Sequence, residues 1–198
     1  MKEINVKGTV RTALGKKAAR DIRKANAVPC NLYGEAKNEN GAPQALSFTA
    51  TNDELRNLIY SPDIYAVNLN IDGKECKAVL KEIQFHPVKD NVLHVDFYEI
   101  TENKPIVMEV PIKLNGLAEG VKAGGRLAAS VRKLKVKALY TNIPERLNID
   151  VTNLGLGKTI KVGELSFEGL ELLNAKEAVV CAVKLTRAAR GAQAAANN

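Results

Sequence analysis

The stretch VNLNIDGKECKAVLKEI, residues 67–83, gives the clearest indication of the fold. Two runs of alternating apolar and polar residues flank the dipeptide Asp72-Gly73. This dipeptide suits the two-residue type I′ turn, whose backbone twist matches the twist of paired strands. The stretch therefore predicts a β-hairpin, and it indicates that the first half of the chain is built mainly from strands.

The segments around this hairpin predict further strands and two short helices. Residues 3–10 (EINVKGTV) alternate in the manner of a strand, and residues 91–100 (NVLHVDFYEI) form another strand candidate. One helix is expected within residues 13–29. A second begins at Thr51, where Thr51 and Glu54 fit a capping box ahead of apolar residues at helical spacing.

The pattern changes after about residue 100. The polar stretch TENKP (101–105) reads as a linker, and the segments that follow are short strands with little helical periodicity, as in an all-β sandwich or barrel. The expected strands are 106–114, 134–140, 146–151, 159–165 and 177–185. The predicted division is a β domain with two helices over 1–100, an all-β domain over 101–186 and a disordered tail over 187–198.

Composition limits the class of protein. The 198 residues are 45% apolar, which is enough for a real core, and no apolar run approaches membrane-spanning length. Cys30, Cys76 and Cys181 are few and scattered, as is typical of free thiols in a reducing compartment. We therefore expect a soluble, cytoplasmic protein without a membrane partner.

The charge is unevenly distributed. The net charge is +7, but residues 1–34 hold eight Lys/Arg against two acids, whereas residues 35–100 hold six against eleven and residues 101–198 hold fifteen against nine. The excess in the first block lies in ALGKKAARDIRKANAVP (13–29), where Lys16, Lys17 and Arg20 crowd the start of the helix. Cations are unfavourable at that end of the helix dipole, and a bound phosphate backbone would remove the cost. A solvated charged face is the alternative.

Motifs for catalysis, nucleotides or metals are weak. LGLGKT (154–159) does not fit a P-loop, because Thr152 stands where that motif requires its first glycine and because the segment precedes a strand. The sequence has no C-x-x-C pair and two histidines, so we expect no metal and no cofactor. His94 and Asp96 would share one face of a strand. They could be a solvated polar pair, a pair that contacts a ligand or, least favoured, a catalytic pair, although no nucleophile elbow is present.

Two stretches of the sequence together resemble a known family, VRTALGKKAARDIRKANAVPCNLYG (10–34) and IQFHPVKDNVLHVDFYEI (83–100). This family is large-subunit protein twenty-five, the bacterial ribosomal proteins that bind 5S rRNA. Residues 110–151 resemble the extra β domain of the longer members, known as general stress protein Ctc. The resemblance implies a non-enzymatic protein of the large ribosomal subunit. Its N-terminal domain would be a six-stranded β-barrel, similar to the anticodon-binding domain of glutaminyl-tRNA synthetase, that docks on the minor-groove side of the loop E region of 5S rRNA.

The resemblance also implies which residues contact RNA. A basic group and a base-reading group would converge on one surface of the barrel, with arginines and lysines on phosphates and the polar residues on base edges and 2′-hydroxyls. The basic group is Arg11, Lys16, Lys17, Arg20 and Arg23, with Tyr33 nearby, and the second group is Gln84, His94 and Asp96. The sequence departs from the family pattern at Ala19, Asp21 and Phe85, where serine, a basic residue and arginine are common.

Other assignments remain open on the sequence. The same barrel could serve a tRNA-binding factor or a stress-related accessory factor. The second domain carries a basic stretch whose contact could be a neighbouring ribosomal protein, additional rRNA or solvent; its cations are Lys122, Arg126, Arg132, Lys133, Lys135 and Lys137. Off the ribosome we expect a monomer.

Overall fold

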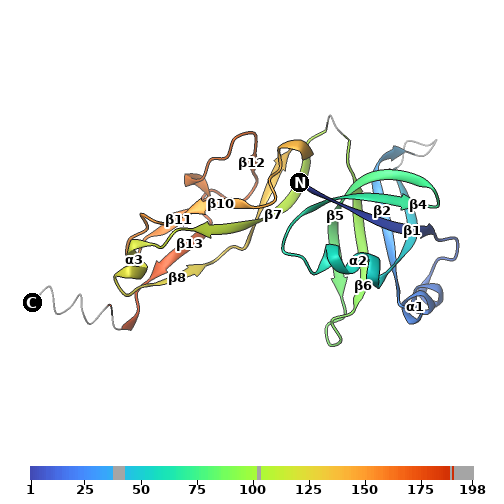
Figure 1. The fold of residues 1–198 in the computed structure, drawn as a ribbon, viewed down its shortest axis with the longest axis horizontal. Coiled ribbons are helices and arrows are strands. Elements are labelled where there is room, and N and C mark those ends of the chain that lie inside the picture. The colour runs from blue at the N-terminus through green and yellow to red at the C-terminus, as the bar shows by residue number, and fades with distance from the viewer. Residues whose placement is uncertain (38–42, 102–103, 188, 190–198) are drawn as a thin grey trace, which may run out of the picture. The chain divides into compact units, whose positions relative to one another are not determined.

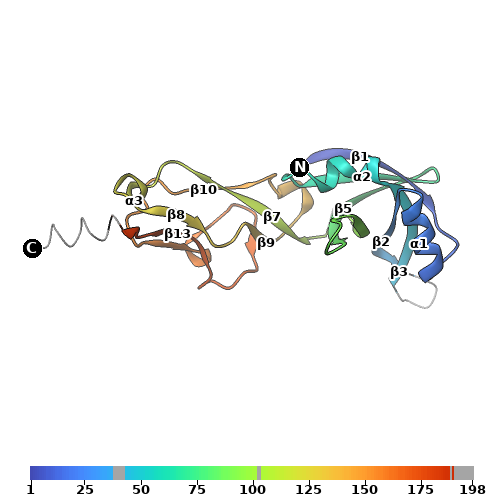
Figure 2. The same ribbon diagram turned by 90° about the horizontal axis from the view of Figure 1, so that it is seen from below.

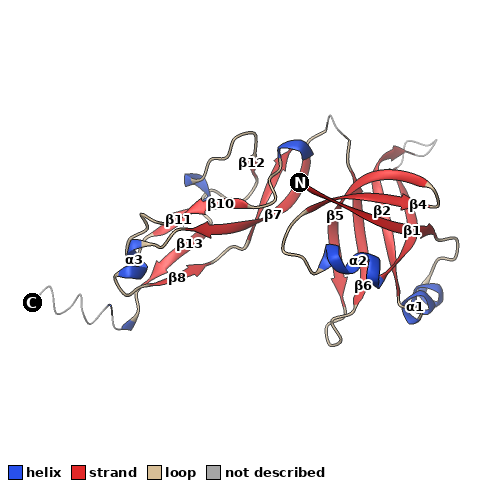
Figure 3. Ribbon diagram, viewed as in Figure 1, coloured by secondary structure: helices blue, strands red, loops and turns tan. Residues whose placement is uncertain are grey.

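The computed structural model describes the chain except residues 38–42, 102–103, 188 and 190–198, so most of the tail expected to be disordered lies outside the described residues. The chain divides into two compact units. The first comprises residues 1–106 with 139–141, and the second comprises 107–138 with 142–198. Strands dominate both units, which confirms the mainly β fold class (Figures 1 and 3).

The first unit is a closed barrel of six strands in the order β1-β3-β2-β6-β5-β4. The pairs β1·β4 and β2·β6 are parallel and the other neighbouring pairs are antiparallel. This confirms the six-stranded barrel that the family resemblance implies. The strands are β1 (Lys2–Val10), β2 (Ala27–Lys37), β3 (Pro43–Thr51), β4 (Tyr65–Ile71), β5 (Lys74–Phe85) and β6 (Val92–Glu99).

The predicted hairpin joins β4 to β5. Asp72 has φ of 48° and Gly73 has φ of 87°, the positive values that a type I′ turn requires at both central residues. The Asp72 carboxylate also accepts a hydrogen bond of 2.8 Å from the backbone N–H of Val10. The turn is therefore bonded to the end of β1 as well as closing its own hairpin.

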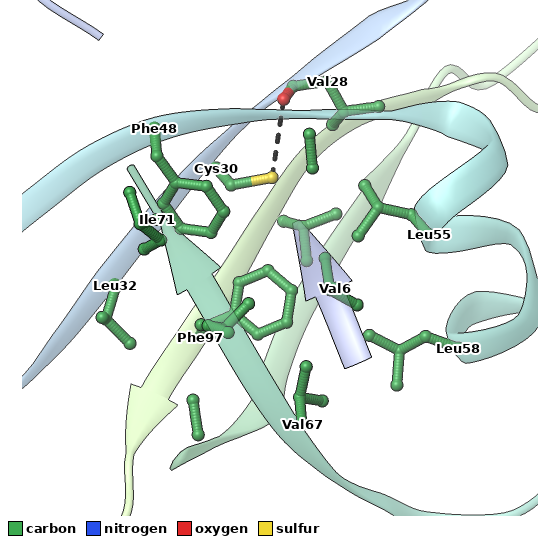
Figure 4. Packing of buried hydrophobic residues seen from close by; sticks show 14 of the residues in the cluster. Val6, Val28, Cys30, Leu32, Phe48, Leu55, Leu58, Val67, Ile71 and Phe97 are labelled. Carbon is green, nitrogen blue, oxygen red and sulfur yellow. Dashed lines mark hydrogen bonds between the residues drawn. The ribbon is translucent and has the colours of Figure 1, made fainter. Parts of the chain in front are cut away.

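Helix α2 (Asn52–Ile59) begins where the capping signal predicts. The Thr51 hydroxyl accepts a hydrogen bond of 3.4 Å from the backbone N–H of Glu54, while the Glu54 carboxylate accepts one from the backbone N–H of Lys7 on β1. In the predicted capping box, Thr51 therefore caps the helix, whereas the side chain of Glu54 is bonded to strand β1. Leu55 and Leu58 of this helix point into the barrel core (Figure 4).

Helix α1 (Lys16–Lys24) occupies the middle of the segment expected to be helical. It follows Gly15, whose φ of 103° favours glycine, and it ends before Asn26, where a φ of 59° turns the chain into β2. None of its residues is fully buried. The helix lies against the outside of the barrel next to β2 (Figure 2).

The barrel encloses one apolar core. Val6, Phe48, Val67 and Phe97 are fully buried in it, and the rings of Phe48 and Phe97 lie 5.7 Å apart (Figure 4). Burial of side chains of this size contributes about 1.5–3 kcal/mol each to folding. The outer face of the same strands is consequently free to carry polar groups.

The second unit holds a four-stranded sheet in the order β10-β7-β9-β12 and a three-stranded sheet in the order β11-β13-β8. The predicted all-β character is confirmed, although the structure adds β8, β12 and a single-turn helix to the expected strands. The elements are β7 (Ile106–Asn115), α3 (Glu119–Lys122), β8 (Arg126–Ala129), β9 (Lys133–Ala138), β10 (Leu147–Asp150), β11 (Thr159–Lys161), β12 (Glu171–Leu172) and β13 (Val179–Lys184). Two 3-10 turns, η1 (Tyr140–Asn142) and η2 (Val162–Glu164), complete the chain's described elements. Within the described residues, every helix is too short or too polar to cross a membrane.

Candidate nucleic-acid interface

The predicted polar pair lies on the outer face of β6. Val95 and Phe97 of this strand are buried in the core, so His94 and Asp96 point outward. The Nδ1 atom of His94 lies 3.3 Å from Oδ1 of Asp96, and each side chain keeps 21% of its surface exposed. The pair is therefore preformed and accessible at the barrel surface.

The neighbouring strands extend this pair into a row of polar and aromatic residues. Gln84 of β5 stands directly opposite His94, and Asn31 of β2 stands opposite Asp96. Residues paired in this way project to the same face of the sheet. The barrel thus brings Gln84, His94 and Asp96 together, as the family resemblance implies.

Tyr33 lies at the edge of the same row. It is paired with Tyr98 of β6, and the two rings meet edge to face with their centres 6.0 Å apart. Partial burial raises the pKa of Tyr33, and the negative charges of Asp96 and Glu82 raise it further. The Tyr33 hydroxyl therefore keeps its proton at neutral pH and can donate a hydrogen bond.

Arg23 connects the basic helix to this row. Its Nε atom donates a hydrogen bond of 2.9 Å to the backbone carbonyl of Leu93, the residue before His94. The bond fixes the last turn of α1 beside the start of β6. Two segments seventy residues apart in sequence consequently lie on one continuous surface.

The remaining helix cations are exposed at the helix start. Lys16 and Lys17 occupy the first turn, which contains no acidic residue and receives no side-chain cap from Gly15. Arg20 follows one turn later and is also exposed. Lys16 and Lys17 therefore lie at the positive end of the helix dipole, as the sequence indicates, whereas Arg23 and Lys24 lie in the last turn, where cations are favourable.

Arg11 differs from the helix cations because it is partly buried. Its Nε atom is enclosed and has no hydrogen-bond partner within the described part of the chain. Its backbone N–H donates 2.9 Å to the carbonyl of Ser47 on β3. Its guanidinium lies close enough to Cys30 to lower the pKa of that thiol slightly, although burial raises this pKa to about 12 overall.

Sequence reasoning missed several members of this surface. The Ser47 hydroxyl donates 3.0 Å to Oδ1 of Asn31, and the hydroxyls of Thr9 and Thr49 lie 2.8 Å apart on the adjoining strands. The alternation of buried Cys30 and Leu32 with outward Asn31 and Tyr33 was a usable signal. Pro29 and Gly34 interrupt the strand pattern of β2 and obscure this signal.

Part of the basic stretch of the second unit alternates with buried residues along β9. Leu134 and Val136 of this strand are buried, whereas Lys133 and Lys135 are exposed. Lys137 continues the outward row and forms a 3.2 Å ion pair with Glu171 of β12. Part of this charge is thus neutralised within the unit.

Comparison with known proteins gives the family. A profile described as Ribosomal L25p family matches residues 6–97, and one described as ribosomal protein TL5, C-terminal domain, matches residues 105–187. A protein of Phocaeicola vulgatus named large ribosomal subunit protein bL25 is 70% identical over 99% of both chains. The chain belongs to the ribosomal L25p family.

Other members of the L25p family agree with this assignment. Proteins with the same name from Bacteroides thetaiotaomicron and Porphyromonas gingivalis are 65% and 59% identical, over 99% and 97% of this chain and the same shares of their own. The family consists of ribosomal proteins, which are structural and non-enzymatic. Membership of this family favours the non-catalytic interpretations of His94 and Asp96.

Proposed function

We propose that this L25p-family protein is a constituent of the large ribosomal subunit, in the cytoplasm, that binds 5S rRNA at the loop E region from the minor-groove side. The binding surface is the outer face of β2, β6 and β5 together with α1. The observation that carries the proposal is the bond between Arg23 and Leu93, because it joins a basic helix to a row of base-reading side chains.

The strand row has the chemistry required for reading base edges. Asp96 can accept hydrogen bonds from base amino groups, Gln84 can both donate and accept, and His94 lies between them. RNA displays its base edges and 2′-hydroxyls in a wide, shallow minor groove that such a flat surface can approach. A carboxylate would weaken a surface that bound only phosphates, so Asp96 supports recognition of bases.

The helix supplies contacts with phosphates. Lys16, Lys17 and Arg20 are exposed on one element, and an anion at the helix start would relieve their unfavourable position. Phosphate contacts provide affinity and fix the orientation of the protein, whereas base contacts provide specificity. The helix cations should therefore contribute mainly to affinity, and the strand row mainly to specificity, so the two contributions can be measured separately.

A gel-shift titration at several salt concentrations tests both contributions. Arg20→Ala should weaken binding of 5S rRNA and reduce the dependence of log K on log salt by about 0.7–0.9, the amount expected for one lost phosphate contact. Asp96→Asn should leave that slope unchanged but reduce the preference for 5S rRNA over an unrelated RNA duplex by about 1–3 kcal/mol.

Lys7→Ala provides the control, because Lys7 is an exposed cation of β1 outside the proposed surface. Its affinity and its slope should match those of the unmodified protein. If Arg20→Ala and Asp96→Asn both behaved like this control, the proposed surface would be wrong.

A further inference from the structure

A second cationic surface lies beside the proposed RNA face. A groove of about 530 Å³ opens between α1, α2 and the turn that joins β5 to β6. Arg20 and Arg23 line its α1 wall, so it adjoins the surface already described. Its other cations are Lys24, Arg56 and Lys89.

The charge of this groove is strongly one-sided. Five Lys/Arg side chains line it, whereas Asp53 is its single acidic residue. Within the described residues, Arg20, Lys24, Arg56 and Lys89 form no ion pair. Residues 35–100 carry an excess of acids, yet they place two of their six cations here, Arg56 and Lys89.

The walls of the groove are held in place by hydrogen bonds. Arg23 fixes α1 to β6 through Leu93, as described above. Asn52, at the start of α2, donates from its side chain to Oδ1 of Asn26 at 2.6 Å and from its backbone to the Asn26 carbonyl at 3.2 Å. These bonds join the loop after α1 to the beginning of α2.

The third wall is a compact turn centred on His86. The backbone N–H groups of Val88 and Lys89 both donate to Nδ1 of His86 at 3.2 Å, and the His86 N–H donates to the Asn91 carbonyl at 2.8 Å. Because Nδ1 accepts, the neutral ring carries its proton on Nε2. Lys89 is therefore presented from an ordered turn.

We infer that this groove binds a second stretch of RNA phosphate backbone, so that the RNA-binding surface continues past α1 to Arg56 and Lys89. Cations from three elements converge on one open groove and, among the described residues, form no ion pair there. This arrangement matches a phosphodiester chain, which carries a charge at every nucleotide. Exposed Tyr60, which retains 66% of its surface at the groove, offers a ring on which a base can stack. The inference rests on the proposed binding of 5S rRNA.

The double variant Arg56→Gln/Lys89→Gln tests this inference in the full-length protein with 5S rRNA as the probe. Both side chains are exposed, so the fold should be retained, and circular dichroism checks this. The matched control is Lys7→Gln/Lys74→Gln, which removes the same charge from exposed positions of the same unit away from the groove. A filter-binding titration measures affinity from 0.1 to 0.5 M salt.

Two lost phosphate contacts predict binding roughly 15- to 30-fold weaker at about 0.15 M salt and a slope shallower by about 1.4–1.8. The control should stay within about two-fold of the unmodified protein. Equal affinities of the groove variant and the control, with Arg20→Ala still weakening binding, would overturn the groove and leave the proposed function standing. Equal affinities of the groove variant and the control are also the result expected if the groove binds an acidic protein segment and not RNA. Failure of the unmodified protein to bind 5S rRNA would overturn both.

Discussion

Phe85 follows Gln84 on β5, at a position where the family resemblance implies arginine, and its side chain is 44% exposed. An apolar ring of this size beside a polar row contributes neither charge nor a hydrogen-bond donor. The surface of this chain is therefore less cationic at this point than the family pattern implies. The substitution is accessible to a direct test because the side chain does not support the core.

Phe85→Arg should strengthen binding of 5S rRNA roughly four- to five-fold at about 0.15 M salt, as expected for one added phosphate contact. Leu173→Arg is the matched control, because Leu173 has the same exposed fraction of 44% but belongs to the second unit. Gel-shift titration of both variants gives the comparison. Equal gains in the two would show that added charge, not its position beside Gln84, changes affinity.

At the scale of single elements, β1 has a specific steric requirement at Gly8. A Cβ atom at this position would lie 2.6 Å from Cδ2 of Phe48 and 3.3 Å from the carbonyl oxygen of Thr49. Phe48 is fully buried, and its ring packs against that of Phe97. The absent side chain at Gly8 thus provides the space that the Phe48 ring occupies.

Gly8→Val should consequently lower the free energy of unfolding by about 1–3 kcal/mol, the usual cost of overpacking a core. Lys7→Val, on the adjacent exposed position of the same strand, should change it by no more than about 0.5 kcal/mol. Urea unfolding followed by circular dichroism measures both variants. A Gly8→Val protein as stable as Lys7→Val would contradict the packing described here.

The elements that could be predicted from sequence are those determined by local signals. The hairpin at Asp72-Gly73, the cap at Thr51 and the outward pair on β6 each depend on residues within a few positions of one another. β2 and β3 were missed because Pro29 and Gly34 interrupt the first and Pro43 begins the second. Such residues weaken a strand pattern, and only pairing with distant strands overrides them.

The sequence likewise predicts one part of the candidate site and not another. The spacing of His94 and Asp96 indicated a shared face, and the cations of α1 were evident from their position in the helix. The groove could not be foreseen, because Arg56 and Lys89 stand alone among acidic neighbours in the sequence. Only the closure of the barrel brings them beside Arg20.

At the scale of the whole molecule, each unit has its own buried side chains. Phe48 and Phe97 are completely buried in the first unit. In the second unit, Leu134 is completely buried and Ile143 is 1% exposed. A unit with its own core can in principle fold alone. All residues of the proposed RNA-binding surface belong to the first unit, which should therefore bind RNA without the second.

A fragment of residues 1–106 should therefore unfold cooperatively and bind 5S rRNA with the salt dependence of the full chain. The fragment 107–198 also contains an excess of cations, so it serves as the control for attraction by charge alone. It should not prefer 5S rRNA over an unrelated duplex. Calorimetry and gel-shift titration measure the two properties, and a fragment 1–106 without 5S rRNA affinity would contradict the assignment.

The parallel pairing of β2 with β6 has a consequence for synthesis of the protein. A chain emerges from its N-terminus, so residues 27–37 are made long before residues 92–99, with which they must pair. Contacts between segments so distant in sequence form late and slowly. α1 reaches its final position only when the carbonyl of Leu93 is available to Arg23. A nascent chain shorter than about one hundred residues therefore presents its lysines and arginines without a completed surface, and recognition of specific RNA must wait for the last barrel strand.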